Sequence, residues 1–207
     1  MATEIFIEAP TEKFFEALTY SCHIHENQAR KGTEKPYISH ILGVASIVFE
    51  YGGTETEAIG GLLHDAIEDG KDGIDGIDGG KKIRAEDLLA KFGKEITDIV
   101  VGCTEAQTDP KPAWKERKDA YIKHLLSASK SVHIVSAADK LYNTRSILND
   151  YRELGEELWT RFNATKNESL WYYRSLADIF KIAGLAPKPL IDELNRVVKK
   201  IEKKARG

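Results

Sequence analysis

Apolar residues recur at helical spacing through almost the whole chain, and this repeated pattern constrains the fold more than any other feature. The first such segment begins at Thr11 and carries four of them on one face: Phe14, Phe15, Leu18 and Cys22. The next segment carries its own stripe: Ile41, Val44, Ile47 and Val48. No run alternates apolar and polar residues between hairpin turns, as a half-buried strand would. The sequence therefore predicts an all-α fold.

Cap and breaker residues divide this pattern into separate helices. Thr54, followed three residues later by Glu57, has the capping-box pattern, and Gly70 is expected to end the helix that starts there. Further helices follow, among them a long one expected over residues 156–183 and a last amphipathic one that ends in lysines. Because no repeat or linker divides the chain, we expect a single domain over residues 1–207.

Charge and composition exclude several classes of protein. The formal net charge of −3 argues against a general nucleic-acid binder, which would be basic overall. No stretch approaches the roughly 18 apolar residues of a membrane span, and the opening MATEIFIEAP lacks the features of a secretion signal. Cys22 and Cys103 have no CxxC spacing, so we expect two reduced thiols. We therefore expect a cytoplasmic protein with no membrane or nucleic-acid partner.

The segment GGLLHDAIEDG sets His64 and Asp65 side by side behind an apolar run. A further histidine, His40, ends PYISH, and Asp139 follows apolar and small residues in VSAADKLYN, so it should be buried. Two histidines and two aspartates suit Mn²⁺, Fe²⁺ or Zn²⁺ better than a soft metal. Adjacent side chains on a helix point about 100° apart, so His64 and Asp65 could share an ion only beside the helix axis.

Each of these residues also has an ordinary explanation. A single histidine on an apolar helix is most often a core residue, and an aspartate at a helix end is usually solvated or a cap. The combination of His40, the adjacent pair and a distant buried Asp139 favours a metal site over four separate explanations.

Glu68 and Asp69 add two carboxylates to the same segment. Glu68 lies four residues after His64, on the same face of the expected helix. A carboxylate beside a divalent ion can take a proton from a water whose pKa the ion has lowered. Acids near a helix C-terminus are disfavoured by the helix dipole, so we expect a cationic group nearby.

Cationic residues that could hold an anionic ligand occur in two further places. One is a stripe at helical spacing: Trp114, Arg117, Lys118 and Tyr121. This stripe predicts a clamp for a phosphate group, although a solvated helix face explains it nearly as well. The other place is the pair Arg30 and Lys31, in the segment that leads to His40.

Helical spacing sets Asn143 beside Asp139, and Lys140 beside Thr144. Asn143 could bind a ribose or phosphate group, or be an unremarkable surface residue. The remaining histidines are expected to be structural: His23, His25, His124 and His133. The Gly- and Asp-rich segment over residues 70–80 does not have EF-hand spacing, so we expect a surface loop rather than a calcium site.

Four blocks of the sequence together resemble a known family. ARKGTEKPYISHILGVA, GLLHDAIEDG, KFGKEITDIVVGCT and ADKLYNTRSI, in this order and at these distances, are similar to the HD-domain hydrolases of the RelA/SpoT group. The members nearest in size are the stand-alone small alarmone hydrolases and the metazoan SpoT homologue. The resemblance covers about residues 11–150.

The resemblance implies an all-α, HD-type helical bundle with a metal-site core over about residues 11–150 and C-terminal helices over 156–205 packed on it. It implies one divalent ion, usually Mn²⁺, held by four residues: His40, His64, Asp65 and Asp139. Glu68 and Asp69 match the acidic pair beside the attacking water. The expected nucleotide contacts are Arg30, Lys31, Arg117, Lys118 and Asn143, and we add Tyr121 and Lys140 to them.

We therefore predict a Mn²⁺-dependent hydrolase that removes the 3′-pyrophosphate of guanosine tetra- and pentaphosphate. One alternative is an HD phosphohydrolase for another nucleotide, such as an adenosine analogue or NADPH. A second is a nucleotide-binding regulator without turnover, and a third is an all-α scaffold without a ligand. The acidic pair Glu68 and Asp69 argues against the last two. The sequence leaves open whether the chain forms a homo-oligomer.

Overall fold

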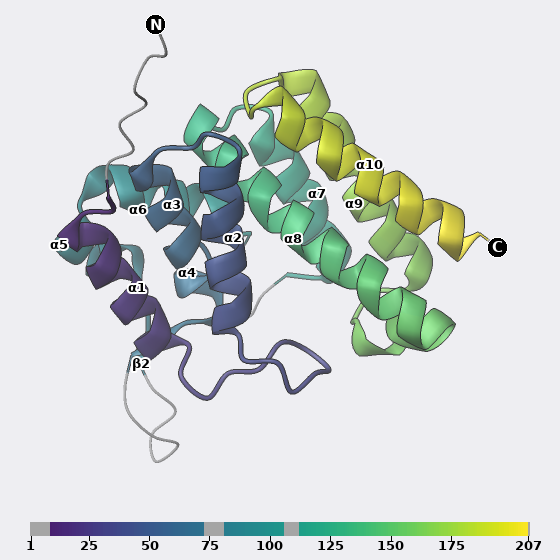
Figure 1. The fold of residues 1–207 in the computed structure, drawn as a ribbon, viewed down its shortest axis with the longest axis horizontal. Helices are drawn as coiled ribbons and strands as arrows, with labels where there is room; N and C mark the ends of the chain where they lie inside the picture. The colour runs from purple at the N-terminus through teal and green to yellow at the C-terminus, as the bar shows by residue number, and fades with distance from the viewer. Residues whose placement is uncertain (1–8, 73–80, 106–111, 207) are drawn as a thin grey trace, which may run out of the picture.

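Helices account for nearly all the regular structure in a computed structural model that describes residues 9–72, 81–105 and 112–206 (Figure 1). In chain order they are α1 (Glu12–Ile24), α2 (Ile38–Glu50), α3 (Glu55–Leu63), α4 (Ala66–Asp69), α5 (Ala85–Phe92), α6 (Lys94–Cys103), α7 (Trp114–Leu125), α8 (Lys130–Leu154), the 3-10 helix η1 (Gly155–Arg161), α9 (Lys166–Ala183) and α10 (Lys188–Ala205). A two-residue antiparallel pair, β1 (Lys71–Asp72) and β2 (Lys81–Lys82), is the exception. The all-α prediction is confirmed.

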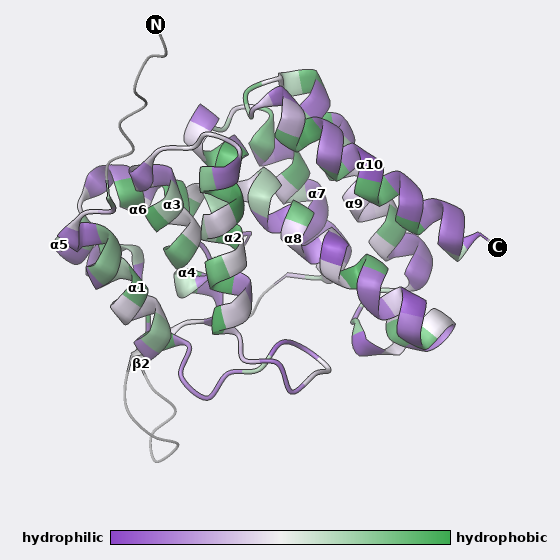
Figure 2. Ribbon diagram, in the orientation of Figure 1, coloured by the Kyte–Doolittle hydropathy of each residue, from purple (hydrophilic) through white to green (hydrophobic). Residues whose placement is uncertain are grey.

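Helix α2 joins two hydrophobic regions. Its residues Ile41 and Ala45 pack in a cluster with apolar side chains of α1, α3, α5 and α6. Val44 and Val48, which lie on another face of the same helix, pack with α7, α8, α9 and α10. Helices α9 and α10 lie along α8 in Figure 1, and the apolar residues of α10 alternate with polar ones at helical spacing in Figure 2. The long helix α8 is therefore held between α2 and the C-terminal pair.

The predicted capping box at Thr54 is present. The Thr54 hydroxyl accepts a hydrogen bond from the backbone N–H of Glu57 at 3.3 Å, and the Glu57 carboxylate accepts one from the backbone N–H of Thr54 at 2.8 Å. Thr11 stands at the N-cap position of α1, but its hydroxyl donates to Glu55 at 2.5 Å instead of capping its own helix. The beginning of α1 is therefore tied to the beginning of α3.

The expectation of one long helix over residues 156–183 is wrong. Helix α8 continues to Leu154 and ends at Gly155, whose φ of 57° is readily adopted only by glycine. The chain then forms η1, and α9 begins at Lys166 after a second capping box at Thr165. This interruption allows the chain to return along α8.

Three further expectations can be compared with the described residues. Within them, no helix is both long enough and apolar enough to span a bilayer. Cys22 and Cys103 are both free thiols, the first exposed and the second buried. Most of the Gly- and Asp-rich segment, residues 73–80, lies outside the described residues, so the expected surface loop stays a prediction.

Candidate active site

The helix that was expected to run through His64 and Asp65 is interrupted at these two residues. Helix α3 ends at Leu63, α4 begins at Ala66, and Asp65 between them has φ −96° and ψ 2°. His64 keeps helical backbone angles, so Asp65 is the residue at which the chain departs from the helix. His64 Nε2 lies 3.0 Å from Asp65 Oδ2.

His40 and Asp139 complete a four-residue cluster with this pair. His40 is in the first turn of α2, and its Nε2 lies 3.2 Å from His64 Nε2 and 3.4 Å from Asp65 Oδ2. Asp139 is on α8, and its Oδ1 lies 3.4 Å from His40 Nε2 and 3.8 Å from His64 Nε2. Asp139 is buried, as predicted from the small and apolar residues before it. The four predicted ligand residues thus come together from three separate parts of the chain.

Hydrogen bonds determine which ring nitrogens face the cluster. His64 Nδ1 lies 2.8 Å from the Gly61 carbonyl oxygen, which can only accept, so a neutral His64 carries its proton on Nδ1. Its Nε2 then presents a lone pair to Asp65 and His40. Two imidazole nitrogens and two carboxylate oxygens that converge in this way suit a divalent cation, because the donors would otherwise repel each other.

The charges of His64 and Asp65 depend on each other. Burial would raise the pKa of the Asp65 carboxyl, but His64 and His40 hold it well below its usual range. Burial would lower the pKa of His64, but the Asp65 and Asp139 carboxylates raise it to about 9. Positive charge is therefore strongly favoured at this point, as a proton or as a metal ion.

A second set of side chains orients the two carboxylates. Tyr37 donates a hydrogen bond to Asp65 Oδ2 at 2.5 Å. Lys140 Nζ donates to Asp139 Oδ2 at 2.5 Å, and Asn143 Nδ2 donates to Asp139 Oδ1 at 2.5 Å. The predicted proximity of Asn143 to Asp139 is confirmed. Tyr37 was not predicted, although its position three residues before His40 in PYISH could have indicated it.

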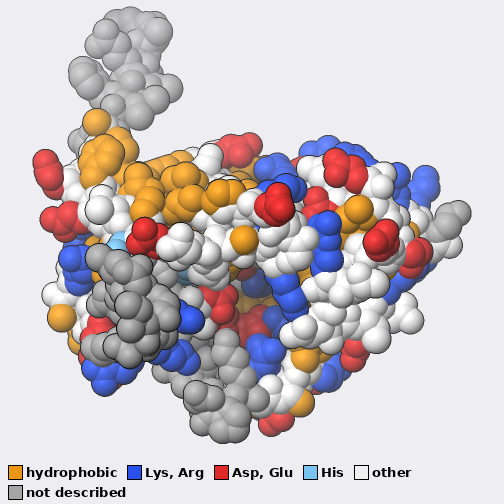
Figure 3. All heavy atoms as spheres, turned by 90° about the horizontal axis from the view of Figure 1, so that it is seen from below, with side chains coloured by type: hydrophobic (Ala, Val, Ile, Leu, Met, Phe, Trp, Pro, Cys, Tyr) orange, Lys and Arg blue, Asp and Glu red, His pale blue; other side chains and the backbone are white. Residues whose placement is uncertain are grey.

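The cluster opens into a cleft of about 360 Å³, which we call the inner cleft. Its lining includes His40, Asp65, Glu68, Asp69, Glu105, Trp114, Arg117, Lys118, Asp139 and Lys140. Glu68 and Asp69 belong to the single turn of α4, and not to the end of a longer helix as expected. The expected cationic group is present, because Lys118 and Glu68 interact electrostatically. A hollow bordered by acidic and basic side chains is visible on the face shown in Figure 3.

The predicted phosphate clamp on α7 is paired with a carboxylate that the sequence did not indicate. Glu105 accepts hydrogen bonds from Arg117 Nη1 at 3.2 Å, from Lys118 Nζ and from the Tyr172 hydroxyl at 2.8 Å. Burial would raise the pKa of Glu105, but Lys118 and Lys140 lower it, so the acid is ionised. Glu105 holds both α7 cations at the wall of the cleft.

The expectation that Tyr121 contacts substrate needs correction. Tyr121 is 2% exposed, and its hydroxyl pairs with Ser136 Oγ at 2.7 Å. The preceding residues of the stripe, Arg117 and Lys118, line the inner cleft, but Tyr121, one turn later on α7, packs in the core against α8. Its ring lies 5.5 Å below Lys140 Nζ, so it supports that lysine and does not line the inner cleft.

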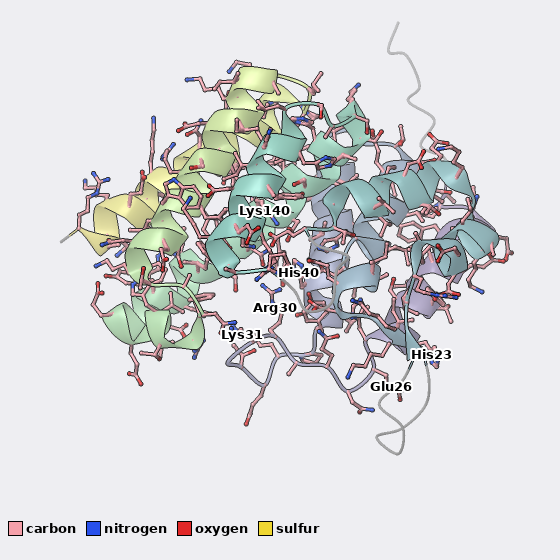
Figure 4. The ribbon with its side chains drawn as sticks, turned by 180° about the vertical axis from the view of Figure 1, so that it is seen from behind. His23, Glu26, Arg30, Lys31, His40 and Lys140 are labelled. Atoms are coloured by element: carbon pink, nitrogen blue, oxygen red, sulfur yellow. The ribbon has the colours of Figure 1, made fainter. Side chains whose placement is uncertain are left out.

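Arg30 and Lys31 lie where the inner cleft continues into a second cleft of about 650 Å³, the outer cleft. Arg30 Nη2 donates to Asn143 Oδ1 at 2.6 Å, and Lys31 Nζ donates to Asn163 Oδ1 at 2.7 Å. Figure 4 shows Arg30 and Lys31 in the loop below α8, close to His40 and Lys140, whereas His23 lies farther away. The basic pair is therefore positioned between the two clefts.

Comparison with known proteins agrees with this geometry. The model of the HD domain family matches residues 17–170. A Xenopus tropicalis protein, guanosine-3′,5′-bis(diphosphate) 3′-pyrophosphohydrolase MESH1, is 36% identical over 135 residues, which cover 64% of this chain and 68% of the relative. The Homo sapiens protein of the same name is 32% identical over 138 residues, which cover 65% and 69%.

Two solved structures share the fold. One, described as a metazoan ortholog of SpoT that hydrolyzes ppGpp, superimposes with a TM-score of 0.73 at 24% identity and covers 94% of this chain and 98% of its own. The other, a Listeria monocytogenes protein, has a TM-score of 0.67 at 30% identity and covers 79% and 99%. Both matches extend over most of the helical arrangement described above.

Proposed function

The chain belongs to the HD domain family, and on that premise we propose that it is a metal-dependent hydrolase of guanosine tetra- and pentaphosphate that releases the 3′-pyrophosphate. The observation that carries the proposal is the convergence of His40, His64, Asp65 and Asp139 at the floor of a cleft with acidic and basic walls. The 3′-pyrophosphohydrolase names of the relatives supply the substrate.

The donor set fits one divalent ion, for which we propose Mn²⁺. The ligands would be the Nε2 atoms of His40 and His64 with carboxylate oxygens of Asp65 and Asp139. An ion bound there would lower the pKa of a water molecule and polarise a phosphoryl oxygen. Mixed nitrogen and oxygen ligands of this kind suit Mn²⁺ and other first-row divalent ions.

The chain's own residues have distinct tasks in this proposal. Glu68, assisted by Asp69, accepts a proton from the attacking water, since both acids line the inner cleft beside the cluster. Lys140, Arg117 and Lys118 counter the negative charge of the 3′-pyrophosphate group while water attacks its phosphorus and the bond from that phosphorus to the ribose 3′-oxygen breaks. Asn143, fixed between Asp139 and Arg30, is in a position to contact the nucleotide where the two clefts join.

The test is a nucleotide panel assayed with the purified protein. In the presence of Mn²⁺, guanosine 3′,5′-bis(diphosphate) should release pyrophosphate, and EDTA should stop the release. The adenosine counterpart and NADPH belong in the same panel. Turnover of one of these without turnover of the guanosine compound would overturn the substrate, and equal turnover in EDTA would overturn metal dependence.

A further inference from the structure

An acidic residue in the outer cleft, Asp150, has no part in the chemistry proposed above. We propose that Asp150 selects guanine over adenine, an inference that rests on the proposed function because it requires a nucleotide in the two joined clefts. The carboxylate lines the outer cleft and is 14% exposed.

Helix α8 connects Asp150 to the candidate metal centre. Asp139, Asn143 and Asp150 are separated by four and seven residues, a spacing that sets them on one side of the helix. At 1.5 Å per residue, Asn143 and Asp150 are about 10 Å apart along the axis. Asp139 and Asp150 are about 16 Å apart along the same axis, so a nucleotide with its 3′-phosphates at Asp139 would extend past Asn143 with its base toward Asp150.

The walls of the outer cleft suit an aromatic base. Tyr142, Phe162, Tyr173 and Ile147 line it, and a pocket with apolar and aromatic walls and a few polar groups is typical of small-molecule sites. The Arg30 guanidinium lies 5.6 Å from the Tyr142 ring centre, which leaves a cation and an aromatic ring at the entrance from the inner cleft.

Two cations stand next to the Asp150 carboxylate. Lys35 Nζ lies 3.4 Å from Oδ1, and Arg161 Nη1 lies 3.4 Å from Oδ2. Arg161 can come this close because Gly32 leaves room: a Cβ on Gly32 would lie 2.8 Å from Arg161 Cδ. Each carboxylate oxygen of Asp150 therefore has one cationic partner at 3.4 Å. Because a carboxylate oxygen can accept more than one hydrogen bond, both oxygens can also accept hydrogen bonds from a ligand.

This arrangement of acceptor and donors complements the edge of guanine. A carboxylate can accept from both the N1–H and the N2 amino group, while a neighbouring cation can donate to O6, an acceptor that Arg and Lys commonly bind. Adenine instead offers an amino group and an unprotonated N1 at that edge. A carboxylate facing N1 of adenine would set two acceptors against each other, so adenine should be disfavoured.

The alternative explanation of Asp150 is purely structural. In that case the carboxylate only ties the loop with Lys35 to η1 with Arg161, and base preference would not depend on it. Two other acids line the outer cleft: Glu50 is exposed, and Asp69 also lines the inner cleft, where the proposed chemistry uses it. Arg145 is paired with Glu193 at 3.4 Å. Among the described acids of that cleft, Asp150 thus has the burial and the flanking donors that base recognition requires.

The test compares Asp150→Asn with Glu153→Gln. Both remove one negative charge from α8, but Glu153 is exposed and does not line either cleft. The ratio of kcat/KM for the guanosine and adenosine bis(diphosphates) is the readout, since a general change in phosphate attraction cancels in it. Asp150→Asn should lower this ratio by roughly 5-fold to 150-fold, the value of one bidentate base contact. Glu153→Gln should leave it unchanged.

The effect of Asp150→Asn on the adenosine compound should be opposite in sign to its effect on the guanosine compound. An amide can donate to N1 of adenine and accept from its amino group, so Asp150→Asn should also raise kcat/KM for the adenosine compound. The unmodified protein should turn over the inosine analogue, which lacks the N2 amino group, less well than the guanosine compound. An unchanged guanosine-to-adenosine ratio in a folded Asp150→Asn protein, with an unchanged melting temperature, would overturn the proposal.

Binding of GDP and ADP in EDTA separates this inference from the proposed function. Stronger binding of GDP by the unmodified protein, lost in Asp150→Asn, supports base selection even if no bis(diphosphate) is hydrolysed. Equal binding of GDP and ADP by the unmodified protein contradicts base selection even if hydrolysis is observed.

Discussion

The inner and outer clefts differ in how their key residues are related in the sequence. In the inner cleft, His64 and Asp65 are adjacent, Asp139 and Asn143 are one helical turn apart, and Glu68 follows within the same segment. In the outer cleft, Asp150 on α8 contacts two residues of other elements. Lys35 belongs to the loop before α2, and Arg161 belongs to η1, which follows α8 after the break at Gly155. Tertiary packing assembles both clefts, but the inner cleft also contains short local runs of functional groups, from His64 to Asp69 and from Asp139 to Asn143, whereas Asp150 meets its partners only from other elements.

This difference has a consequence for mutation. Changes in the inner cleft should affect metal binding or the rate of the chemical step, because its residues surround the reacting atoms. Changes in the outer cleft should affect KM and the choice of base and leave metal binding intact. The two clefts share several lining residues, among them Arg30, Lys31 and Asn143, and both kinds of effect should appear at these positions.

The strongest test of this division is Asp65→Ala. It removes a candidate ligand and leaves His64 without its buried counter-charge, so bound Mn²⁺ and turnover should both fall by more than the roughly 100-fold that loss of an outer-shell partner can cost. Metal content and pyrophosphate release measure the two effects. Asp98→Ala is the control, since that carboxylate is 61% exposed on α6 and pairs with Lys94. Retention of metal by Asp65→Ala would contradict the ligand assignment.

Glu68→Gln should separate chemistry from metal binding within the inner cleft. The amide cannot accept the proton from the attacking water, so kcat should fall by about 10²-fold to 10⁴-fold. Metal content should stay at the level of the unmodified protein, because Glu68 is not in the four-residue cluster. Glu95→Gln, at an exposed position of α6, is the matched control. A large loss of metal would mean that Glu68 acts as a ligand and not as a base.

Tyr37→Phe tests the support of the candidate metal centre. The change removes one hydroxyl from Asp65 Oδ2 and keeps the ring that stacks against His25 at 4.9 Å. Mn²⁺ affinity should fall by about 10-fold to 100-fold, as for other partners of ligating carboxylates. Titration of Mn²⁺ measures the change, and Tyr151→Phe, whose hydroxyl pairs with exposed Glu156, serves as the control. Unchanged affinity would show that Asp65 needs no support from Tyr37.

The smallest expected effect belongs to the rim of the outer cleft. Lys35→Gln removes an ion pair whose lysine side chain is 63% exposed, and such pairs are worth about 0–1 kcal/mol. KM for the guanosine substrate should change by no more than roughly 5-fold, while kcat and Mn²⁺ affinity stay constant. Lys123→Gln, exposed on α7, provides the comparison. A fall in Mn²⁺ affinity here would break the division between the two clefts.

Much of the fold and of the inner cleft could be predicted from the sequence, because their signals are local. Apolar spacing and the capping box at Thr54 locate helices without knowledge of tertiary contacts. The interruption at His64 and Asp65 could not be predicted, since GGLLHDAIED has no proline and is compatible with a continuous helix. The local pattern therefore gives no signal for the break, which is visible only in the backbone angles of Asp65.

The residues that were missed have their partners in other elements of the structure. Glu105 is recognised only through Arg117, Lys118 and Tyr172, and Asp150 only through Lys35 and Arg161. Tyr121 was assigned to the substrate because it shares a helix face with Arg117 and Lys118. Helical spacing does not show which residues of such a face line a cleft and which are buried in the core. Ligand roles for the predicted metal and catalytic residues stay predictions until metal binding and turnover are measured.

Helix α8 has one further consequence. Over Lys130–Leu154 it contains no glycine or proline, and it is packed against α2 on one side and α10 on another, so it should behave as a stiff rod. Asp139 and Asp150 are both attached to this rod, about 16 Å apart along its axis. The distance between the two ends of the proposed nucleotide site is therefore fixed by the rigidity of a single helix, so a substrate must span it without the help of a hinge.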